Sequence, residues 1–107
     1  MGKQSLNSSQ MDKLADKGAK LRRACIDSVD GDVALVFVDG HDDAILGVAE
    51  RDGEVCVVYD QAKIIQTLRR RDGMDKEGAV EFLEYNMAGS CGGGGTPIFL
   101  RRAANEI

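Results

Sequence analysis

The spacing of small and apolar positions predicts an amphipathic helix at the start of the chain. Ser8 or Ser9 can cap its first turn. The residues that then recur on one helical face, at steps of three and four, are Met11, Leu14, Gly18, Leu21 and Cys25. Lysine and arginine occupy the opposite face. We therefore expect residues 1–26 to form an N-terminal amphipathic helix and residues 27–107 to form a single domain.

Four apolar runs further along the chain predict strands. The first, "VALVFV" at 33–38, is rich in β-branched residues and is typical of a strand covered on both faces. The runs "AILGVAE" at 44–50 and "EVCVVY" at 54–59 flank an Asp-Gly pair, which is a strong hairpin signal. "PIFLR" at 97–101 predicts a short last strand, with Pro97 at its first position or on a sheet edge.

Two further helices are predicted between the hairpin and the last strand. Asp60 is placed to cap residues 61–71, which Gly73 ends, and Asp75 is placed to cap residues 76–87. The order of elements is α-β-β-β-α-α-β. Because the strands precede these helices and do not alternate with them, we expect an α+β domain. It should contain a small antiparallel sheet of three to four strands, with two to three helices packed on one face.

The composition is that of a soluble globular protein with one core. The chain has 107 residues, of which 43% are hydrophobic but only 5% aromatic, so its core must be aliphatic. No stretch approaches the roughly 18 apolar residues that a membrane span requires. The first residues also lack the apolar run of a signal peptide. We therefore expect a cytoplasmic protein with no membrane partner.

Charge is distributed unevenly along the chain. Residues 1–26 carry a net charge of +4, residues 27–60 carry −9, and residues 61–107 carry +1, which gives −4 in total. This asymmetry can steer a partner, although it is also compatible with an ordinary solvated surface. The pI near 4.9, and the absence of aromatic residues beside Arg69, Arg70 and Arg71, argue against nucleic acid as a partner. Three cations at the end of a helix are favoured by the helix dipole alone.

The most acidic turn of the chain, at residues 39–43, is the candidate functional site. It contains Asp39, His41, Asp42 and Asp43. As exposed charges they can contact a partner protein. As clustered oxygen ligands, the three aspartates could alternatively hold Mg²⁺ or Mn²⁺, and an enzyme built on the loop could also recruit Glu81 or Glu84. Asp, Gly and His are also common turn residues, so a purely structural turn is a further interpretation.

The cysteine inventory limits the other chemistry. Cys25, Cys56 and Cys91 are far apart, no Cys-x-x-Cys pair exists, and His41 is the only histidine, which excludes the usual zinc ligand spacing. Reduced thiols without a catalytic role are the simplest interpretation. We expect no cofactor.

A glycine-rich loop at 89–95 precedes the last strand. Phosphate-binding glycine loops follow a strand and open into a helix, whereas this loop follows a helix and lacks the lysine of a Walker motif. We therefore expect a flexible connection and not a phosphate site.

The stretch from Asp39 to Phe99 resembles a group of small proteins encoded by tailed bacteriophages. The matching residues are Asp39, Gly40, Asp42, Asp43 and Ala44 in the acidic loop, Gly47 and Val48 in a strand, Val58, Tyr59 and Asp60 at a strand-to-helix junction, Gly73 and Met74 between two helices, and Asn86, Gly89, Gly93, Thr96, Pro97 and Phe99 in the tail. The sequence departs from the pattern at Ser90, where the group has alanine, and at Cys91, where it has a large aromatic residue.

The resemblance implies a phage origin but no particular activity. It also implies that Gly93 holds a special backbone angle while Gly92, Gly94 and Gly95 are slack. Asn86, as part of the tail motif, joins the acidic loop as a candidate partner contact. The leading hypothesis is a small phage-encoded, non-enzymatic protein in the host cytoplasm that binds and modulates a host, defence or phage protein. The alternatives are a metal-dependent or nucleotide-handling enzyme and a structural homo-oligomer.

Overall fold

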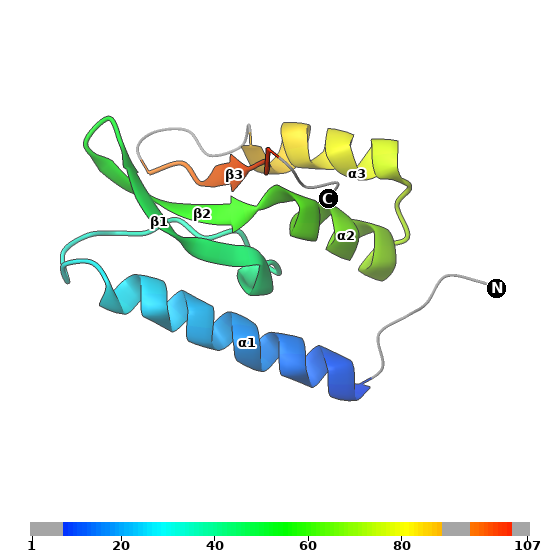
Figure 1. The fold of residues 1–107 in the computed structure, drawn as a ribbon, viewed down its shortest axis with the longest axis horizontal. Helices are drawn as coiled ribbons and strands as arrows, with labels where there is room; N and C mark the ends of the chain where they lie inside the picture. Colours follow the sequence, from blue (N-terminus) through cyan, green and yellow to red (C-terminus); the bar gives the residue numbers. More distant parts are fainter. Residues whose placement is uncertain (1–7, 89–94, 104–107) are drawn as a thin grey trace.

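The computed structural model describes residues 8–88 and 95–103 as three α-helices packed with a three-stranded sheet (Figure 1). The elements in chain order are α1 (Ser8–Asp27), η1 (Asp42–Ala44), β1 (Ile45–Arg51), β2 (Glu54–Asp60), α2 (Gln61–Arg71), α3 (Lys76–Phe82), η2 (Leu83–Ala88) and β3 (Ile98–Leu100). The predicted α+β class is confirmed, and the observed order α-β-β-α-α-β is close to the predicted one.

The hairpin forms where the Asp-Gly pair predicted it. Strands β1 and β2 pair antiparallel, and their register ends with Arg51 opposite Glu54. Asp52 and Gly53, the two residues of the turn, have φ angles of +54° and +81°. Positive φ at both positions is the geometry of a type I′ turn, whose twist matches that of the flanking strands. Local sequence therefore determines this half of the sheet.

The sheet is mixed and not antiparallel throughout, which corrects one detail of the prediction. Strand β3 pairs with β2 in parallel, from Val58 opposite Ile98 to Asp60 opposite Leu100. After β2 the chain passes through α2 and α3 before it returns to the sheet. A helical connection of this length permits the last strand to run in the same direction as its neighbour, which a tight turn cannot do.

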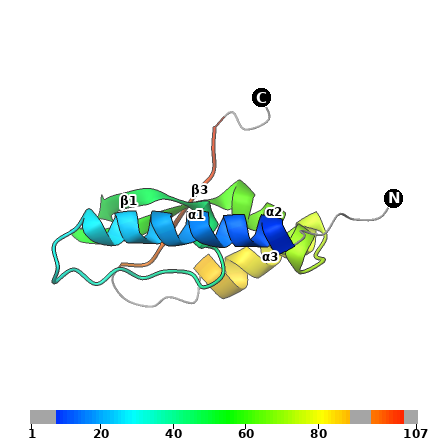
Figure 2. The ribbon, with the colours of Figure 1, turned by 90° about the horizontal axis from the view of Figure 1, so that it is seen from below.

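The predicted strand at 33–38 is not a strand. The backbone N–H of Val38 donates a hydrogen bond to the Tyr59 hydroxyl, over 2.7 Å, and not to a neighbouring strand. Leu35, Phe37 and Val38 pack against the core. Figures 1 and 2 show this segment crossing the same side of the sheet as α3. The apolar run therefore indicated burial correctly. However, the segment is held in the fold by side-chain packing against the core and does not pair with a neighbouring strand.

The core lies on one face of the sheet, as predicted. Its buried residues come from all three α-helices, from η1 and η2, and from two strands; they are Cys25, Ala44, Ile45, Val57, Tyr59, Ile64, Leu68, Ala79 and Leu83. The Tyr59 ring also stacks on Phe99, with ring centroids 5.8 Å apart. Figure 1 shows α1 running alongside β1 at one edge of the sheet, α2 continuing from the end of β2, and α3 near β3 at the opposite edge.

The helix ends confirm some predictions and correct others. Asp75 caps α3, because its Oδ1 accepts a hydrogen bond from the Gly78 N–H over 2.7 Å. Gly73 follows α2 with φ +73°, as expected of a terminating glycine. Asp60 makes no capping bond, which corrects that prediction; its Oδ2 pairs with Arg102 at 3.0 Å. At Leu83 the predicted third helix continues as a π-helix.

Most of the glycine-rich loop, residues 89–94, lies outside the described residues. Gly95 is described, and it is buried with φ +78°. Glycine adopts a left-handed φ angle of this kind without steric cost, whereas other residues rarely adopt it. The backbone at position 95 therefore favours glycine, and the expectation that Gly95 is merely slack is wrong. Within the ranges described, no helix is both long and apolar enough to cross a membrane.

Candidate functional site

The acidic loop lies against α1 through Gly18. A Cβ placed on Gly18 would come 2.8 Å from the Cβ of Asp42 and 3.1 Å from the backbone nitrogen of Asp43. A methyl group at this position would therefore clash with the loop. Gly18 allows a close approach of another backbone, and that backbone belongs to the same chain.

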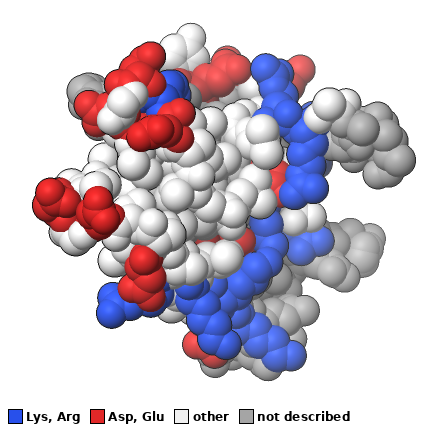
Figure 3. Space-filling view, turned by 60° about the vertical axis from the view of Figure 1, so that its left-hand side comes forward, with Lys and Arg blue, Asp and Glu red and all other residues white. Residues whose placement is uncertain are grey.

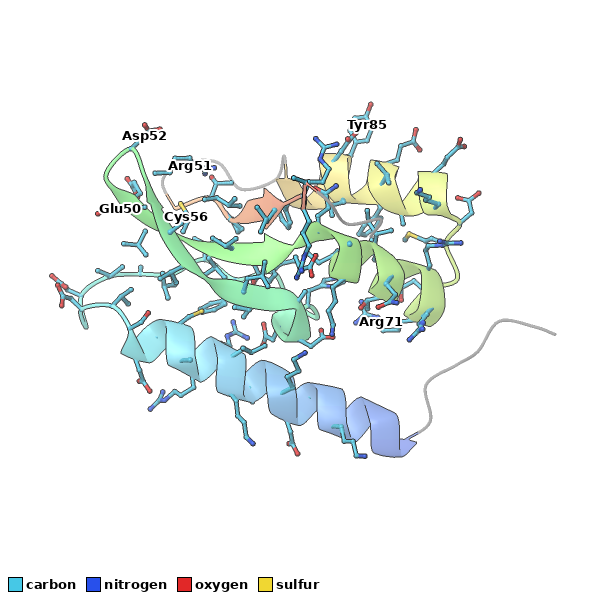
Figure 4. The ribbon with its side chains drawn as sticks, viewed as in Figure 1. Glu50, Arg51, Asp52, Cys56, Arg71 and Tyr85 are labelled. Carbon is cyan, nitrogen blue, oxygen red and sulfur yellow. The ribbon has the colours of Figure 1, made fainter. Side chains whose placement is uncertain are left out.

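Two arginines from different helices hold the loop. Arg22 of α1 pairs with Asp42, with 3.1 Å between Nη1 and Oδ2, and its guanidinium lies 4.2 Å from the centroid of the Phe37 ring. Arg71, at the end of α2, donates a hydrogen bond of 3.0 Å from Nη1 to the Gly40 carbonyl (Figure 4). These contacts fix the loop between α1 and the end of α2.

His41 lies inside the fold and not on its surface. The residue is 1% exposed, and within the described ranges its Nδ1 has no hydrogen-bond partner. Burial lowers the pKa of His41 below 6.5, and the positive charge of Arg71 lowers it further, against the opposing effect of Asp43, Asp72 and Asp42. His41 is therefore neutral at neutral pH and is not accessible to a partner in this state.

The remaining candidate residues are placed differently. Asp39 is exposed, whereas Asp42 and Asp43 are half-buried and Asp42 is already paired with Arg22. Asn86 belongs to η2, and its side chain lies outside the described part. The acidic loop is thus packed into the fold. Of its three carboxylates, Asp42 is paired with Arg22, and Asp39 and Asp43 are the ones that a partner could reach.

A groove of about 600 Å³ runs between α1, the acidic loop and α2. Its lining residues are Ala15, Gly18, Ala19, Arg22, Arg23, Ile26, Gly40, Asp42, Asp43, Thr67 and Arg71. Small and apolar residues of α1 form one wall, and charged side chains of both signs stand around it. A groove of this shape suits a narrow apolar segment bordered by charges.

The surroundings of the groove are predominantly positive on the α1 side. Lys13, Lys17, Lys20 and Arg23 are all exposed on this helix, and Figure 3 shows Lys and Arg gathered along the lower edge of the molecule, where α1 lies. The pKa of Lys63 in α2 is lowered from its ordinary value. Burial of Lys63 is the largest cause, and the nearby ammonium group of Lys17 is the next. Two ammonium groups near one another favour an anionic partner.

The described residues form no metal-binding cluster, and their two thiols are buried. Among the residues described, no group of three or more His, Cys, Asp or Glu side chains is placed to hold a metal ion, and this includes Asp39, Asp42 and Asp43. Cys25 and Cys56 are buried free thiols, and burial raises the pKa of the Cys25 thiol, with a further contribution from Asp42. A protonated, buried thiol is a poor nucleophile. Cys91 lies outside the described residues.

Comparison with known proteins gave no match, whether against protein-family models, curated proteins or solved structures. Function must therefore be inferred from the site itself. Sequence reasoning located the acidic loop but missed its clamps, Arg22 and Arg71. The partner atoms lie 20 and 31 residues away along the chain, and only the basic face of α1 gave a signal for either arginine.

Proposed function

We propose that this chain is a small non-enzymatic binding protein, and that its groove between α1 and the acidic loop receives an acidic segment of another protein. The observation that carries the proposal is the apolar wall of the groove, made by Ala15, Ala19 and Ile26, directly beside the exposed cations of α1. Apolar side chains of a partner would enter the groove while its carboxylates meet the lysines.

Charge supports the choice of an acidic partner. Residues 13–23 of α1 carry five cations and one carboxylate. Complementary potentials accelerate association and add specificity, and both effects weaken as salt screens them. The resemblance of residues 39–99 to small phage proteins favours a phage-encoded modulator of a host or defence protein as the biological setting.

The proposal is tested by two matched variants of α1. Ala19 lines the groove and Ala24 does not, although both are exposed alanines of the same helix. Ala19→Glu places a carboxylate in the groove and should reduce capture of the partner from bacterial lysate at least tenfold. Ala24→Glu adds the same charge outside the groove and should reduce it far less. Equal capture by wild type and both variants would contradict the proposed site.

The alternative of a metal-dependent or nucleotide-handling enzyme draws less support. Asp42 is committed to Arg22 and His41 is buried, so two of the four loop residues are occupied in the fold. Titration with Mn²⁺ tests this alternative directly, because a ligand that binds only the folded state raises the unfolding temperature. We expect no shift at millimolar Mn²⁺, and a saturable shift would favour the enzyme.

A further inference from the structure

The face of the sheet opposite the core is also apolar. Side chains alternate between the two faces of a strand, so Val57 and Tyr59 face the core while their neighbours face away from it. The residues that share this second face, through the register of the three strands, are Gly47, Ala49, Cys56, Val58, Ile98 and Leu100. We call this set the outer face.

Much of the outer face is uncovered by the residues described. A Cβ built on Gly47 would meet no atom within 4 Å. Leu100 is 44% exposed, and Val58 remains partly exposed although it lies on the central strand. Figure 3, which brings the hairpin end of the molecule forward, shows a broad uncharged area bounded by carboxylates on one side and by Lys and Arg on the other.

Cys56 is the exception, because it is completely buried. The Arg51 side chain reaches from β1 across β2 to the carbonyl of Thr96, with 2.9 Å between Nη2 and O. Arg51 and Cys56 lie at the same end of the sheet (Figure 4), and Cys56 is completely buried there. Val58, Ile98 and Leu100 lie further along the outer face and are not completely buried.

The sequence of β2 also indicates that the face of this strand opposite the core is covered by another surface. "VCVVY" at 55–59 is a continuous apolar run, which is typical of a strand buried on both faces and not of one with a solvated face. The core covers one face only. Exposed apolar areas of this kind usually mark an interaction surface.

Opposite charges stand at the two ends of the outer face. At the hairpin end, Arg51, Asp52 and Glu54 carry a net charge of −1. At the other end, where β2 and β3 finish, Asp60, Arg101 and Arg102 carry a net charge of +1. An apolar face with one acidic and one basic end is complementary to a copy of itself turned end for end.

We infer that the outer face binds the outer face of a second copy of this chain, with the strands of the two copies antiparallel. The twofold axis lies between the sheets and perpendicular to the strands, because an axis along the strands would bring acidic end onto acidic end. The hairpin of each copy then meets Arg101 of the other, and Val58, Ile98 and Leu100 are buried between the sheets.

The size of the face sets the strength of this association. Three strands about 4.8 Å apart and up to seven residues long give roughly 300 Å² per copy, from the usual strand dimensions. A stable interface buries about 800 Å² per partner. The dimer should therefore be weak and reversible, forming at protein concentrations from about ten micromolar to one millimolar, and it should loosen as salt screens its ends.

Sedimentation equilibrium of the full chain over that concentration range tests the inference. The wild type should show a monomer–dimer equilibrium that weakens at least threefold between 50 and 500 mM NaCl. Leu100→Ser should weaken it about tenfold. Tyr85→Ser is the matched control, because Tyr85 is 77% exposed but belongs to η2. Figures 1 and 2 show α3, which η2 continues, on the core side of the sheet, so this change should leave the equilibrium unchanged.

A charge exchange tests the orientation independently of apolar packing. Glu54→Lys and Arg101→Glu each place a like charge opposite the partner and should weaken the dimer, while the double variant restores the pair and should recover it. Both positions are exposed, so the fold should tolerate either change. A wild type that stays monomeric at one millimolar would overturn the dimer, and a double variant no better than the singles would overturn its antiparallel arrangement.

Discussion

Gly18 and His41 are the two residues on which the placement of the acidic loop most depends. One is a helical position that tolerates no side chain, and the other is an imidazole enclosed by the loop and the end of α2. Neither role follows from residue type, since glycine in a helix is ordinarily a cost and a lone histidine has many uses. Each becomes interpretable only through its distance to residues far along the chain.

Gly18→Ala should destabilise the fold although alanine is the better helix former. Helix propensity alone would give a gain of about 1 kcal/mol, but the new methyl group would overlap Asp42 at 2.8 Å, and overpacking of this kind costs about 1–3 kcal/mol. Denaturant unfolding measures the difference. Ala19→Gly, at an exposed position of the same helix, should lose about 1 kcal/mol through propensity alone; a stabilised Gly18→Ala would show that α1 can move off the loop.

His41 should make stability depend on pH in the range where few other groups titrate. Its pKa is lowered in the folded state, by burial first and by Arg71 second, so the unfolded chain binds the proton more readily. The stabilisation that neutral His41 gives the folded state is complete above pH 6.5. As pH falls below 6.5 it is lost, at up to about 1.4 kcal/mol of unfolding free energy per pH unit. Unfolding free energies measured from pH 7.5 to 5.5 should show this slope.

The control for His41 is a variant that cannot titrate. Because the chain has one histidine, His41→Gln removes the only imidazole, and its stability should change little between pH 7 and pH 5.5. An unchanged slope in that variant would assign the pH dependence to the carboxylates instead.

At the scale of elements, most of the predictions that rest on a local signal were confirmed, the cap by Asp60 being an exception. The Asp-Gly hairpin, helix α2 and the Asp75 cap each depend on residues a few positions apart. The parallel pairing of β3 and the unpaired segment at 33–38 depend on contacts across the whole chain, and sequence periodicity contains no information on them. The same reason explains why the burial of His41 and the clamps on the acidic loop were not predicted, although the loop itself was singled out as a candidate site.

The cap of α3 offers a test at this scale. This helix has only seven residues, and short helices rely on their caps. Asp75→Ala removes the acceptor of the Gly78 N–H and should cost about 1 kcal/mol in unfolding free energy. Asp75→Asn keeps an acceptor and should retain most of that stability, whereas equal losses in both variants would indicate that the charge of Asp75 matters more than its hydrogen bond.

At the scale of the whole molecule, α1 belongs to the core more closely than its separate position in the sequence indicated. Cys25 is buried in the central cluster and Leu21 packs against it, while Gly18 and Arg22 contact the acidic loop. The sequence alone placed this helix, residues 1–26, outside a single domain formed by residues 27–107. These contacts favour the opposite outcome for its removal.

Deletion of residues 1–26 should therefore disrupt the fold and not release a folded domain. It removes Cys25 from the core cluster that contains Ile45 and Tyr59 and leaves Asp42 without Arg22. Circular dichroism and amide dispersion in NMR spectra of residues 27–107 measure the result. A well-dispersed spectrum would restore the earlier expectation that residues 27–107 fold alone.

The parallel pairing of β3 with β2 has a consequence for how the chain folds. Ile98 lies opposite Val58, so this part of the sheet closes a loop that contains α2 and α3, and such long-range closure is entropically slow. Until it occurs, one edge of the valine-rich β2 has unsatisfied backbone groups. Bare apolar edges recruit strands from other molecules, so refolding at high protein concentration should favour aggregation, and the three residues of β3 act as protection against it.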